Sequence, residues 1–343
     1  MDFSGSHILS IDQFERSDIE KLFSVAESLE SYANKQKVTK VLDGAILGNM
    51  FFEPSTRTRI SFGASFNLLG GSVREITEAG SSSLAKGESL ADTAQVLSGY
   101  SDIIILRHPE EGSVQKFAES SRVPVINAGD GSNEHPSQAL LDLYTIREEI
   151  KQKGKNIDGL KIALVGDLKY GRAVHSLCKI VSLYDDVEIK LISPPELKLP
   201  KSYTDLLEAS NVSFSETENL EDGIKNVDII YVTRVQEERF RSNEDAKKYK
   251  GLLSLNKEIY TANCEPNTVI MHPLPRDSRK DANELDSDLY GNPNLAIFRQ
   301  ADNGVIIRMA LFALVLGVED QISNSDAKRA IELLNSHKLI LQK

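Results

Sequence analysis

The chain has 343 residues, of which 40% are hydrophobic and 27% charged, as is typical of a folded globular protein. Because one hydrophobic core usually stops growing below this length, we expect two domains. The net charge of −11 argues against a nucleic-acid-binding surface. No apolar run reaches the roughly 20 residues of a membrane helix, and residues 1–5 lack the features of a signal peptide.

The cysteine content indicates a reducing compartment. Cys178 and Cys264 are too few for a zinc site of their own, and their apolar or mixed surroundings favour reduced thiols. We therefore expect a cytoplasmic protein.

The first part of the chain alternates predicted helices and strands. A helix begins at Ser17, where Ser17 and Glu20 have the spacing of a capping box, and its apolar residues fall on one face. A strand at 45–52 leads into the polar segment 53–59, and a helix continues to the glycine pair at 70–71. Continuous β-branched residues predict buried strands at 102–106 and 123–127.

A second alternating series follows. The helix that begins at Pro136 extends to about Lys151, and the polar stretch 152–158 has the character of a linker. The later elements are predicted strands at 160–165, 187–192, 228–232 and 268–271 and an apolar helix at 305–316. This alternation predicts an α/β fold with parallel sheets, divided into two domains at 145–155.

The segment 53–59, Glu-Pro-Ser-Thr-Arg-Thr-Arg, places two arginines and three hydroxyls at a predicted helix start. The helix dipole makes this end positive, so acidic side chains are normal there and cations are not. Backbone N–H groups, hydroxyls and a guanidinium together suit a phosphate. The alternative is a Ser55 N-cap with two solvated arginines, but no acidic residue follows in the first turn, as a capping box would require.

Unusual polar residues recur where the predicted strands end. Ligands of open parallel sheets bind beyond these carboxyl ends. The residues are Arg107, His135 and Gln138 after a glycine-rich turn, Arg234 with Gln236, and the turn 272–276. An exposed arginine or a helix-capping histidine is common alone, but four such strand ends favour a binding site.

The loop 166–172, Gly-Asp-Leu-Lys-Tyr-Gly-Arg, also joins a strand to a helix. It lacks the lysine and hydroxyl of a phosphate loop and the glycine spacing of a dinucleotide site, so a nucleotide is disfavoured. Lys169 and Arg172 again place cations at a helix start. We interpret them as a second anion site, suited to a carboxylate.

Three motifs resemble the aspartate/ornithine carbamoyltransferase family, at 52–59, 135–138 and 272–276. Segments 165–177 and 233–239 are similar to the aspartate branch, whereas the ornithine branch typically carries a cysteine where this chain has Pro273. The resemblance runs from about residue 45 to 320. It implies transfer of the carbamoyl group from carbamoyl phosphate to L-aspartate, a step of pyrimidine biosynthesis that would need no metal and no other cofactor.

The resemblance also implies roles for individual residues. The phosphate would be held by Ser55, Thr56, Arg57, Thr58 and Arg107. Thr58, Arg107 and His135 would donate to the carbonyl oxygen, and Gln138 with the turn of Pro273, Leu274 and Pro275 would bind the amino group. Arg172, Arg234 and Gln236 would bind the two carboxylates of aspartate. Glu53, Arg172 and Arg239 match residues that link the domains once both substrates are bound, and we expect the Leu274–Pro275 bond to be cis.

The serine-rich loop 80–88 resembles a mobile loop that reaches the neighbouring subunit's active site. Lys86, and with it Ser82, would then complete a shared site, which implies a homotrimer. Composition alone favours a flexible exposed loop with a solvated lysine. The sequence leaves open a separate regulatory chain, cooperativity, larger assemblies, and the roles of segment 240–251 and of the tail beyond about 320.

The expected organisation is two domains, each a parallel sheet flanked by helices. Residues 1–148 would bind carbamoyl phosphate, 149–302 would bind aspartate, and a C-terminal helix (about 303–343) would return to the first domain. Two alternatives remain: a carbamoyltransferase for another amine, such as ornithine, and a non-catalytic paralogue that binds phosphate-bearing ligands.

Overall fold

The computed structural model describes residues 1–77, 87–240, 242–279, 282–322 and 326–327. The strands are β1 (Val38–Thr39), β2 (Ile46–Phe51), β3 (Ser72–Ile76), β4 (Ile103–His108), β5 (Val125–Asp130), β6 (Lys161–Gly166), β7 (Glu188–Ile192), β8 (Ser213–Thr217), β9 (Ile229–Thr233), β10 (Val269–Met271) and β11 (Asp326–Ala327). The helices are α1 (Arg16–Ala33), α2 (Thr56–Leu68), α3 (Leu90–Ser98), α4 (Ser113–Ser120), α5 (Pro136–Lys151), α6 (Arg172–Val181), α7 (Lys201–Ala209), α8 (Leu220–Gly223), α9 (Asn243–Lys247), α10 (Lys257–Asn263) and α11 (Ile297–Val315).

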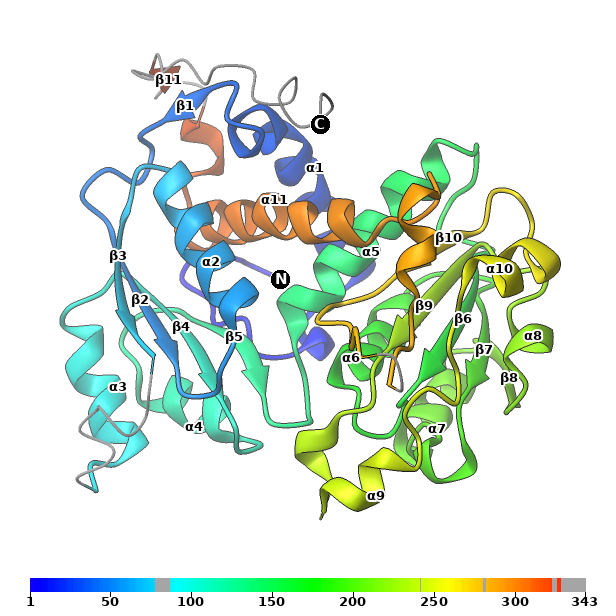
Figure 1. Ribbon diagram of the computed structural model, residues 1–343. Coiled ribbons are helices and arrows are strands. Elements are labelled where there is room, and N and C mark those ends of the chain that lie inside the picture. The colour runs from blue at the N-terminus through cyan, green and yellow to red at the C-terminus, as the bar shows by residue number, and fades with distance from the viewer. Residues whose placement is uncertain (78–86, 241, 280–281, 323–325, 328–343) are drawn as a thin grey trace, which may run out of the picture.

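Two parallel sheets form the two lobes of the molecule, as predicted. One has the strand order β3-β2-β4-β5 and the other the order β10-β9-β6-β7-β8. Figure 1 shows one sheet in each lobe, with α5 and α6, which pack against each other, between them. β1 and β11 form a separate antiparallel pair.

Each sheet has a point where the strand order reverses. In the first sheet the chain moves outward from β2 to β3 and then returns to β4 on the other side of β2. In the second sheet it moves outward from β6 through β7 to β8 and returns to β9. Such reversals leave a crevice beyond the carboxyl ends of the two strands, where α/β proteins bind ligands.

The C-terminal helix α11 returns to the first lobe, as the predicted fold requires. It packs against α1, α2 and α5, and Phe62 and Phe66 of α2 make edge-to-face contacts with Phe312. Most of α11 is buried, which explains its apolar sequence. Within the described ranges, no helix is both long enough and apolar enough to cross a membrane.

Two helix starts differ from the predictions. α1 begins at Arg16 with Glu15 as its N-cap, and the Asp18 carboxylate accepts a hydrogen bond from the Glu15 backbone N–H at 2.8 Å. Ser17 therefore lies in the first turn, and the predicted capping box was wrong. α11 begins at Ile297, eight residues before the predicted start at 305.

Candidate active site

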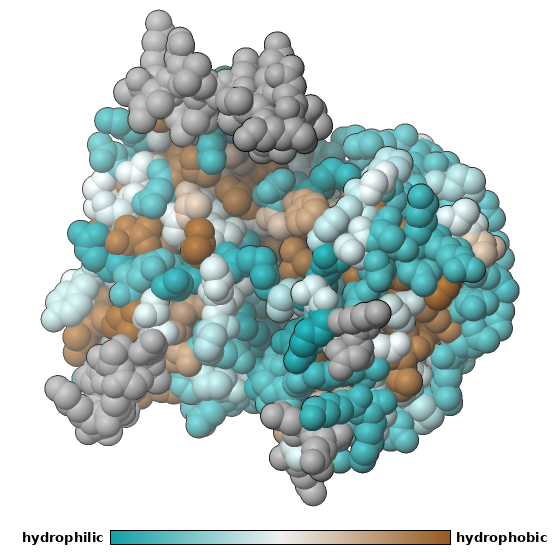
Figure 2. Space-filling view, viewed as in Figure 1, coloured by the Kyte–Doolittle hydropathy of each residue, from teal (hydrophilic) through white to brown (hydrophobic). Residues whose placement is uncertain are grey.

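A cavity of about 870 Å³ lies between the two lobes. Figure 2 shows the surface hollowed there. Both strand-order reversals open into it, since its lining includes Glu53 just after β2 and Arg107 at the end of β4, and Arg172 after β6 and Arg234 just after β9. Fourteen predicted residues line it: Glu53, Ser55, Thr56, Arg57, Thr58, Arg107, His135, Gln138, Arg172, Arg234, Gln236, Pro273, Leu274 and Pro275.

The cavity is cationic although the protein as a whole is acidic. Its described lining contains five arginines but only two carboxylates, Glu53 and Glu238. Clustered guanidinium groups with low-dielectric walls attract anions strongly. The cavity is therefore suited to ligands with several negative charges.

The start of α2 supplies hydrogen-bond donors to the cavity. Ser55 is the N-cap, but its side chain makes no capping hydrogen bond, and the first turn contains no acidic residue. Burial, together with the like charge of Arg234, lowers the pKa of Arg57. Arg59 points elsewhere: it lies 3.4 Å from Glu75 and does not line the cavity. This end of α2 can therefore bind an anion through backbone N–H groups, hydroxyls and one guanidinium.

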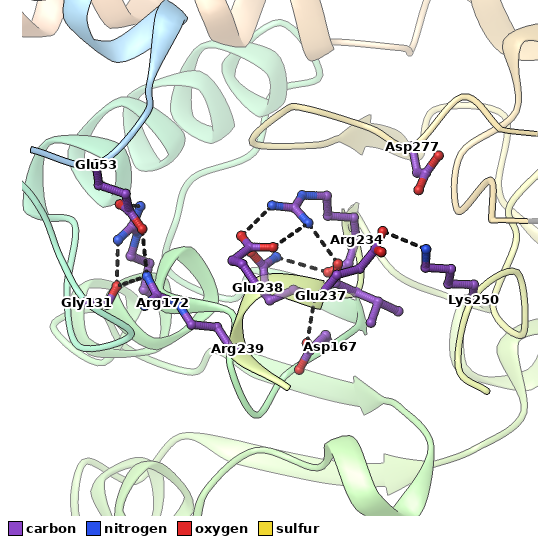
Figure 3. Close-up of polar contacts among 12 residues, drawn as sticks. Glu53, Gly131, Asp167, Arg172, Arg234, Glu237, Glu238, Arg239, Lys250 and Asp277 are labelled. Carbon is purple, nitrogen blue, oxygen red and sulfur yellow. Dashed lines mark hydrogen bonds and ion pairs between the residues drawn. The ribbon is translucent and has the colours of Figure 1, made fainter. Parts of the chain in front are cut away.

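Glu53, just after β2, joins the two lobes. Its carboxylate accepts from Arg107 Nε at 2.8 Å, from Arg172 Nη2 at 3.1 Å and from Arg239 Nη2 at 2.9 Å. Arg107 belongs to β4 in the first lobe, whereas Arg172 begins α6 and Arg239 lies in the 3₁₀ helix Glu237–Arg239, both in the second lobe. Glu53 therefore contacts both arginines of the second lobe in this structure (Figure 3), and a link that forms once both substrates are bound stays a prediction.

Arg172 and Arg239 also bind the glycine-rich turn at the end of β5. Gly131 O accepts from Arg172 Nη1 at 2.5 Å and from Arg239 Nη2 at 2.9 Å. Gly129 has a φ of +126°, and a Cβ there would lie 3.1 Å from the Arg172 guanidinium carbon. Glycine suits this position because its φ is one that L side chains rarely adopt, and because a Cβ would crowd the guanidinium.

Arg107 and His135 lie in a buried, positively charged environment. Burial and the charge of Arg172 lower the pKa of Arg107 to about 9. Burial, followed by the charges of Arg172 and Arg107, keeps the pKa of His135 well below its ordinary value. His135 is therefore neutral near pH 7 and has one N–H to donate.

The end of β9 supplies Arg234 and Gln236. Arg234 makes two hydrogen bonds to the Glu238 carboxylate, at 3.1 and 2.6 Å. The Gln236 backbone N–H donates to Asp167 Oδ2 at 3.0 Å, which ties the loop after β9 to the loop after β6. Figure 3 shows the Arg234–Glu238 pair beside the Glu53 cluster.

The turn 272–275 is fixed by hydrogen bonds of the His272 ring, one to Glu284 and one within the turn. Glu284 Oε1 lies 2.8 Å from His272 Nε2, and the Leu274 N–H donates to His272 Nδ1 at 2.8 Å. The Leu274–Pro275 bond is cis, which confirms that prediction.

Comparison with known proteins identifies the family. Residues 6–148 match the model of the aspartate/ornithine carbamoyltransferase carbamoyl-P binding domain, and residues 158–315 match that of the Asp/Orn binding domain. The chain belongs to the aspartate/ornithine carbamoyltransferase family.

Similar members of this carbamoyltransferase family cover nearly the whole chain. An aspartate carbamoyltransferase catalytic subunit of Saccharophagus degradans is 65% identical over 322 residues, which is 94% of this chain and 96% of that protein. The aspartate transcarbamoylase of Trypanosoma cruzi in complex with carbamoyl phosphate and aspartate has a TM-score of 0.84 at 34% identity, covering 92% and 98% of the two chains. The Methanocaldococcus jannaschii catalytic subunit has a TM-score of 0.81 at 44% identity, with coverage of 92% and 98%.

Some sequence predictions fall elsewhere. Ser82 and Lys86 lie outside the described residues. Lys169 precedes α6, is exposed, and stacks on Tyr170 at 5.2 Å, so it does not line the cavity with Arg172. Among the described His, Cys, Asp and Glu residues, no group of three or more is placed to hold a metal ion.

Sequence analysis missed several polar residues at this site. Arg308 of α11 lines the cavity, is 4% exposed, and donates to Ser61 Oγ of α2 at 2.7 Å. A single arginine inside an otherwise apolar predicted helix was the signal that could have revealed it. Glu238, Gln300 and the buried Asp142 were also missed, and Asp142 lies one helical turn after Gln138.

Proposed function

We propose that this protein transfers the carbamoyl group of carbamoyl phosphate to the amino group of L-aspartate and releases phosphate. The observation that carries the proposal is one cavity with two cationic walls, the start of α2 on one side and Arg234 with Arg172 on the other. A phosphate and a dicarboxylate can then be held at once, with the reacting atoms between them. The names of the similar proteins agree with this substrate pair, and the reaction would serve pyrimidine biosynthesis.

The phosphate would bind at the start of α2. Ser55, Thr56 and Thr58 offer hydroxyls and backbone N–H groups, and Arg57 supplies a guanidinium. Arg107 lies at the end of the neighbouring strand and would share the charge. These donors also stabilise the phosphate as it leaves.

The carbonyl group would be polarised by Thr58, Arg107 and His135. Ser137 Oγ lies 3.4 Å from His135 Nδ1, and a hydroxyl that donates there leaves the imidazole proton on Nε2. When the amine attacks the carbonyl carbon, negative charge develops on the oxygen, and these donors stabilise it. The C–O bond to phosphate then breaks, the phosphate leaves with the bonding electrons, and the proton lost by the amine can pass to the departing phosphate.

The remaining groups would position the two reactants. Gln138 and the carbonyl groups of Pro273 and Leu274, next to Pro275, would accept from the carbamoyl amino group. Arg234, Gln236 and Arg172 would bind aspartate, and Glu53 and Arg239 would keep the lobes in register. Holding both reactants in line gives a large effective molarity, which supplies much of the rate.

The domain roles and the assembly are also proposals. Residues 1–148 with the chain from about 303 would bind carbamoyl phosphate, and residues 149–302 would bind aspartate.

In a homotrimer, Lys86 and Ser82 of one subunit would reach the neighbouring site. Mixing the inactive variants Lys86→Ala and Arg57→Ala after dissociation should then restore activity in hybrid trimers, whereas no recovery would favour a site within one chain. The cytoplasmic location, the absence of metal and a possible regulatory chain stay predictions.

Steady-state assays with carbamoyl phosphate and either amine test the proposed reaction. We expect turnover with L-aspartate and none with L-ornithine, because the Arg234 wall would repel a cationic side chain. Turnover with ornithine alone would contradict the proposal. Phosphate binding without turnover of either amine would indicate the non-catalytic alternative.

A further inference from the structure

A buried carboxylate, Asp142, lies behind the candidate site and has no role in the chemistry described above. We propose that Asp142 positions two amide groups, those of Gln138 and Gln300, and thereby sets the hydrogen-bond acceptors for the amino group of carbamoyl phosphate. This inference rests on the proposed function.

Three side chains from three elements donate to Asp142, which is 0% exposed on α5. Its Oδ1 accepts from Gln138 Nε2 at 2.9 Å and from Gln300 Nε2 at 2.6 Å. Its Oδ2 accepts from the Tyr231 hydroxyl at 2.6 Å. Since α5, α11 and β9 each contribute one donor, the carboxylate lies where the two lobes meet.

The orientation of the Gln138 amide follows from this contact. While Asp142 is ionised, its oxygens only accept hydrogen bonds, and Gln138 turns its NH₂ group toward it. Its carbonyl Oε1 is then the end left for a ligand, and within the described residues no group donates to that atom. Gln138 lines the cavity, so Oε1 can accept from an amino group there. If the Gln138 amide were reversed, its NH₂ group would face the amino group of the ligand, and two hydrogen-bond donors would meet.

Through Gln300, Asp142 also positions the second group of proposed acceptors, the carbonyl groups of the turn 272–275. With its NH₂ group on Asp142, its carbonyl Oε1 accepts from the His272 backbone N–H at 2.9 Å. This bond holds the start of the turn 272–275, whose carbonyl groups are the other proposed acceptors. One carboxylate therefore fixes both sides of the amino-group site.

The cost of this arrangement argues that it serves a function. Burial raises the pKa of Asp142 to about 7, although three side-chain donors and the charge of Arg308 oppose the rise. Burying a carboxylate is unfavourable unless hydrogen bonds compensate for the lost water. A carboxylate kept at this position is explained by the orientation that it imposes.

Ligands that differ only at the amino group test the inference. Acetyl phosphate carries a methyl group in its place and cannot donate, whereas inorganic phosphate probes the phosphate site alone. The measurement is the Kd of carbamoyl phosphate, acetyl phosphate and inorganic phosphate, by titration calorimetry without aspartate. The selectivity is the Kd of acetyl phosphate divided by that of carbamoyl phosphate.

Three variants separate positioning from stability. Asp142→Leu keeps the number and branching of the side-chain heavy atoms but no acceptor, and should lower the selectivity about three- to tenfold, as expected for one hydrogen bond, with phosphate Kd within about twofold. Asp142→Asn should retain most of the selectivity, because its carbonyl can face the two glutamines and its NH₂ group can donate to the Tyr231 oxygen. Glu149→Gln is the matched control: Glu149 also joins α5 to α11, through Arg299 at 2.5 and 3.0 Å, but lies outside the cavity lining, so its selectivity should not change.

The outcomes are distinguishable. Equal weakening of all three ligands in Asp142→Leu, or unchanged selectivity, would overturn the inference while turnover by the unaltered protein still supports the proposed function. No turnover by the unaltered protein would overturn both. If Asp142→Leu does not fold, Gln300→Met removes the amide through which Asp142 holds the His272 backbone N–H; it should lower the selectivity about twofold to threefold, and no change would overturn the inference.

Discussion

The starts of α2 and α6 place arginines in the same position but use them differently. Each helix follows a parallel strand and carries an arginine in its first turn, Arg57 in α2 and Arg172 in α6. Arg172 is paired with Glu53 and with the carbonyl of Gly131. Among the described residues, no carboxylate pairs with Arg57. The comparison indicates that the protein itself orients Arg172, whereas the charge of Arg57 has no carboxylate partner among the described residues.

Removing Arg57 should therefore have the largest effect. We expect Arg57→Gln to lower kcat/KM by about 10²–10³-fold, because a charged donor to the phosphate is lost where charge develops. The control is Arg59→Gln two residues on, since Arg59 pairs with Glu75 outside the cavity. Its kcat/KM should stay within about twofold. Equal losses in both variants would mean that α2 acts through its general charge rather than through Arg57.

Removing the carboxylate that holds Arg172 should affect stability as well as rate. Glu53→Gln leaves three arginines without their shared counter-charge, and breaking such a buried pair costs about 3 kcal/mol. We also expect kcat to fall about tenfold, because the lobes lose their alignment. Urea unfolding measures the loss of stability, and initial rates measure the loss of kcat. Glu75→Gln removes a more exposed partner and should cost less than about 1 kcal/mol; an equal loss there would contradict the comparison.

The Glu53 contribution should also depend on pH. Burial opposes ionisation of Glu53, but the charges of Arg172 and Arg107 outweigh it, so its pKa is lowered from 4.5. The unfolded chain then takes up a proton before the folded one does, and folding loses stability as the pH falls. The stability difference between the unaltered protein and Glu53→Gln should be complete above about pH 4.5 and shrink below it. A difference that persists at lower pH would show that packing, not charge, holds Glu53.

Arg234 is paired less firmly than Arg172 but, unlike Arg57, it has a carboxylate partner. This partner, Glu238, is close in sequence and half exposed. The Glu238 side chain is 48% exposed, so the pair stabilises the fold little. It does fix the direction of the guanidinium at the end of β9. We expect Glu238→Gln to raise the KM for aspartate about threefold and to leave the KM for carbamoyl phosphate unchanged. A rise in both would place Arg234 on the phosphate side.

The sequence predicted the strand ends well because buried parallel strands are continuous apolar runs, and the polar residue after each run is easily seen. β3 and β8 were missed because they are edge strands with mostly exposed side chains. The first turns of α11 were missed for a different reason. Two of its polar residues there face α5 rather than solvent: Gln300 donates to Asp142 and Asn303 to Thr145, while Arg299 pairs with Glu149 and stays half exposed. A polar residue that is buried by a partner distant in sequence has the same local pattern as an exposed one.

The comparison also predicts a small pH effect from His135, which faces the same arginines. Burial and the charges of Arg172 and Arg107 lower its pKa from 6.5 in the folded protein. Below about pH 6.5, His135 takes up a proton in the unfolded chain but not in the folded one. The free energy of unfolding therefore falls as the pH is lowered. His135→Gln should remove about 0.4 kcal/mol of the loss between about pH 7.5 and 6.5. Denaturant unfolding of both proteins at the two pH values measures this difference, and other titrating groups cancel because they are common to both. If the two proteins lose equal stability, the folded His135 takes up its proton as readily as the unfolded one, and the arginines around it do not keep it neutral.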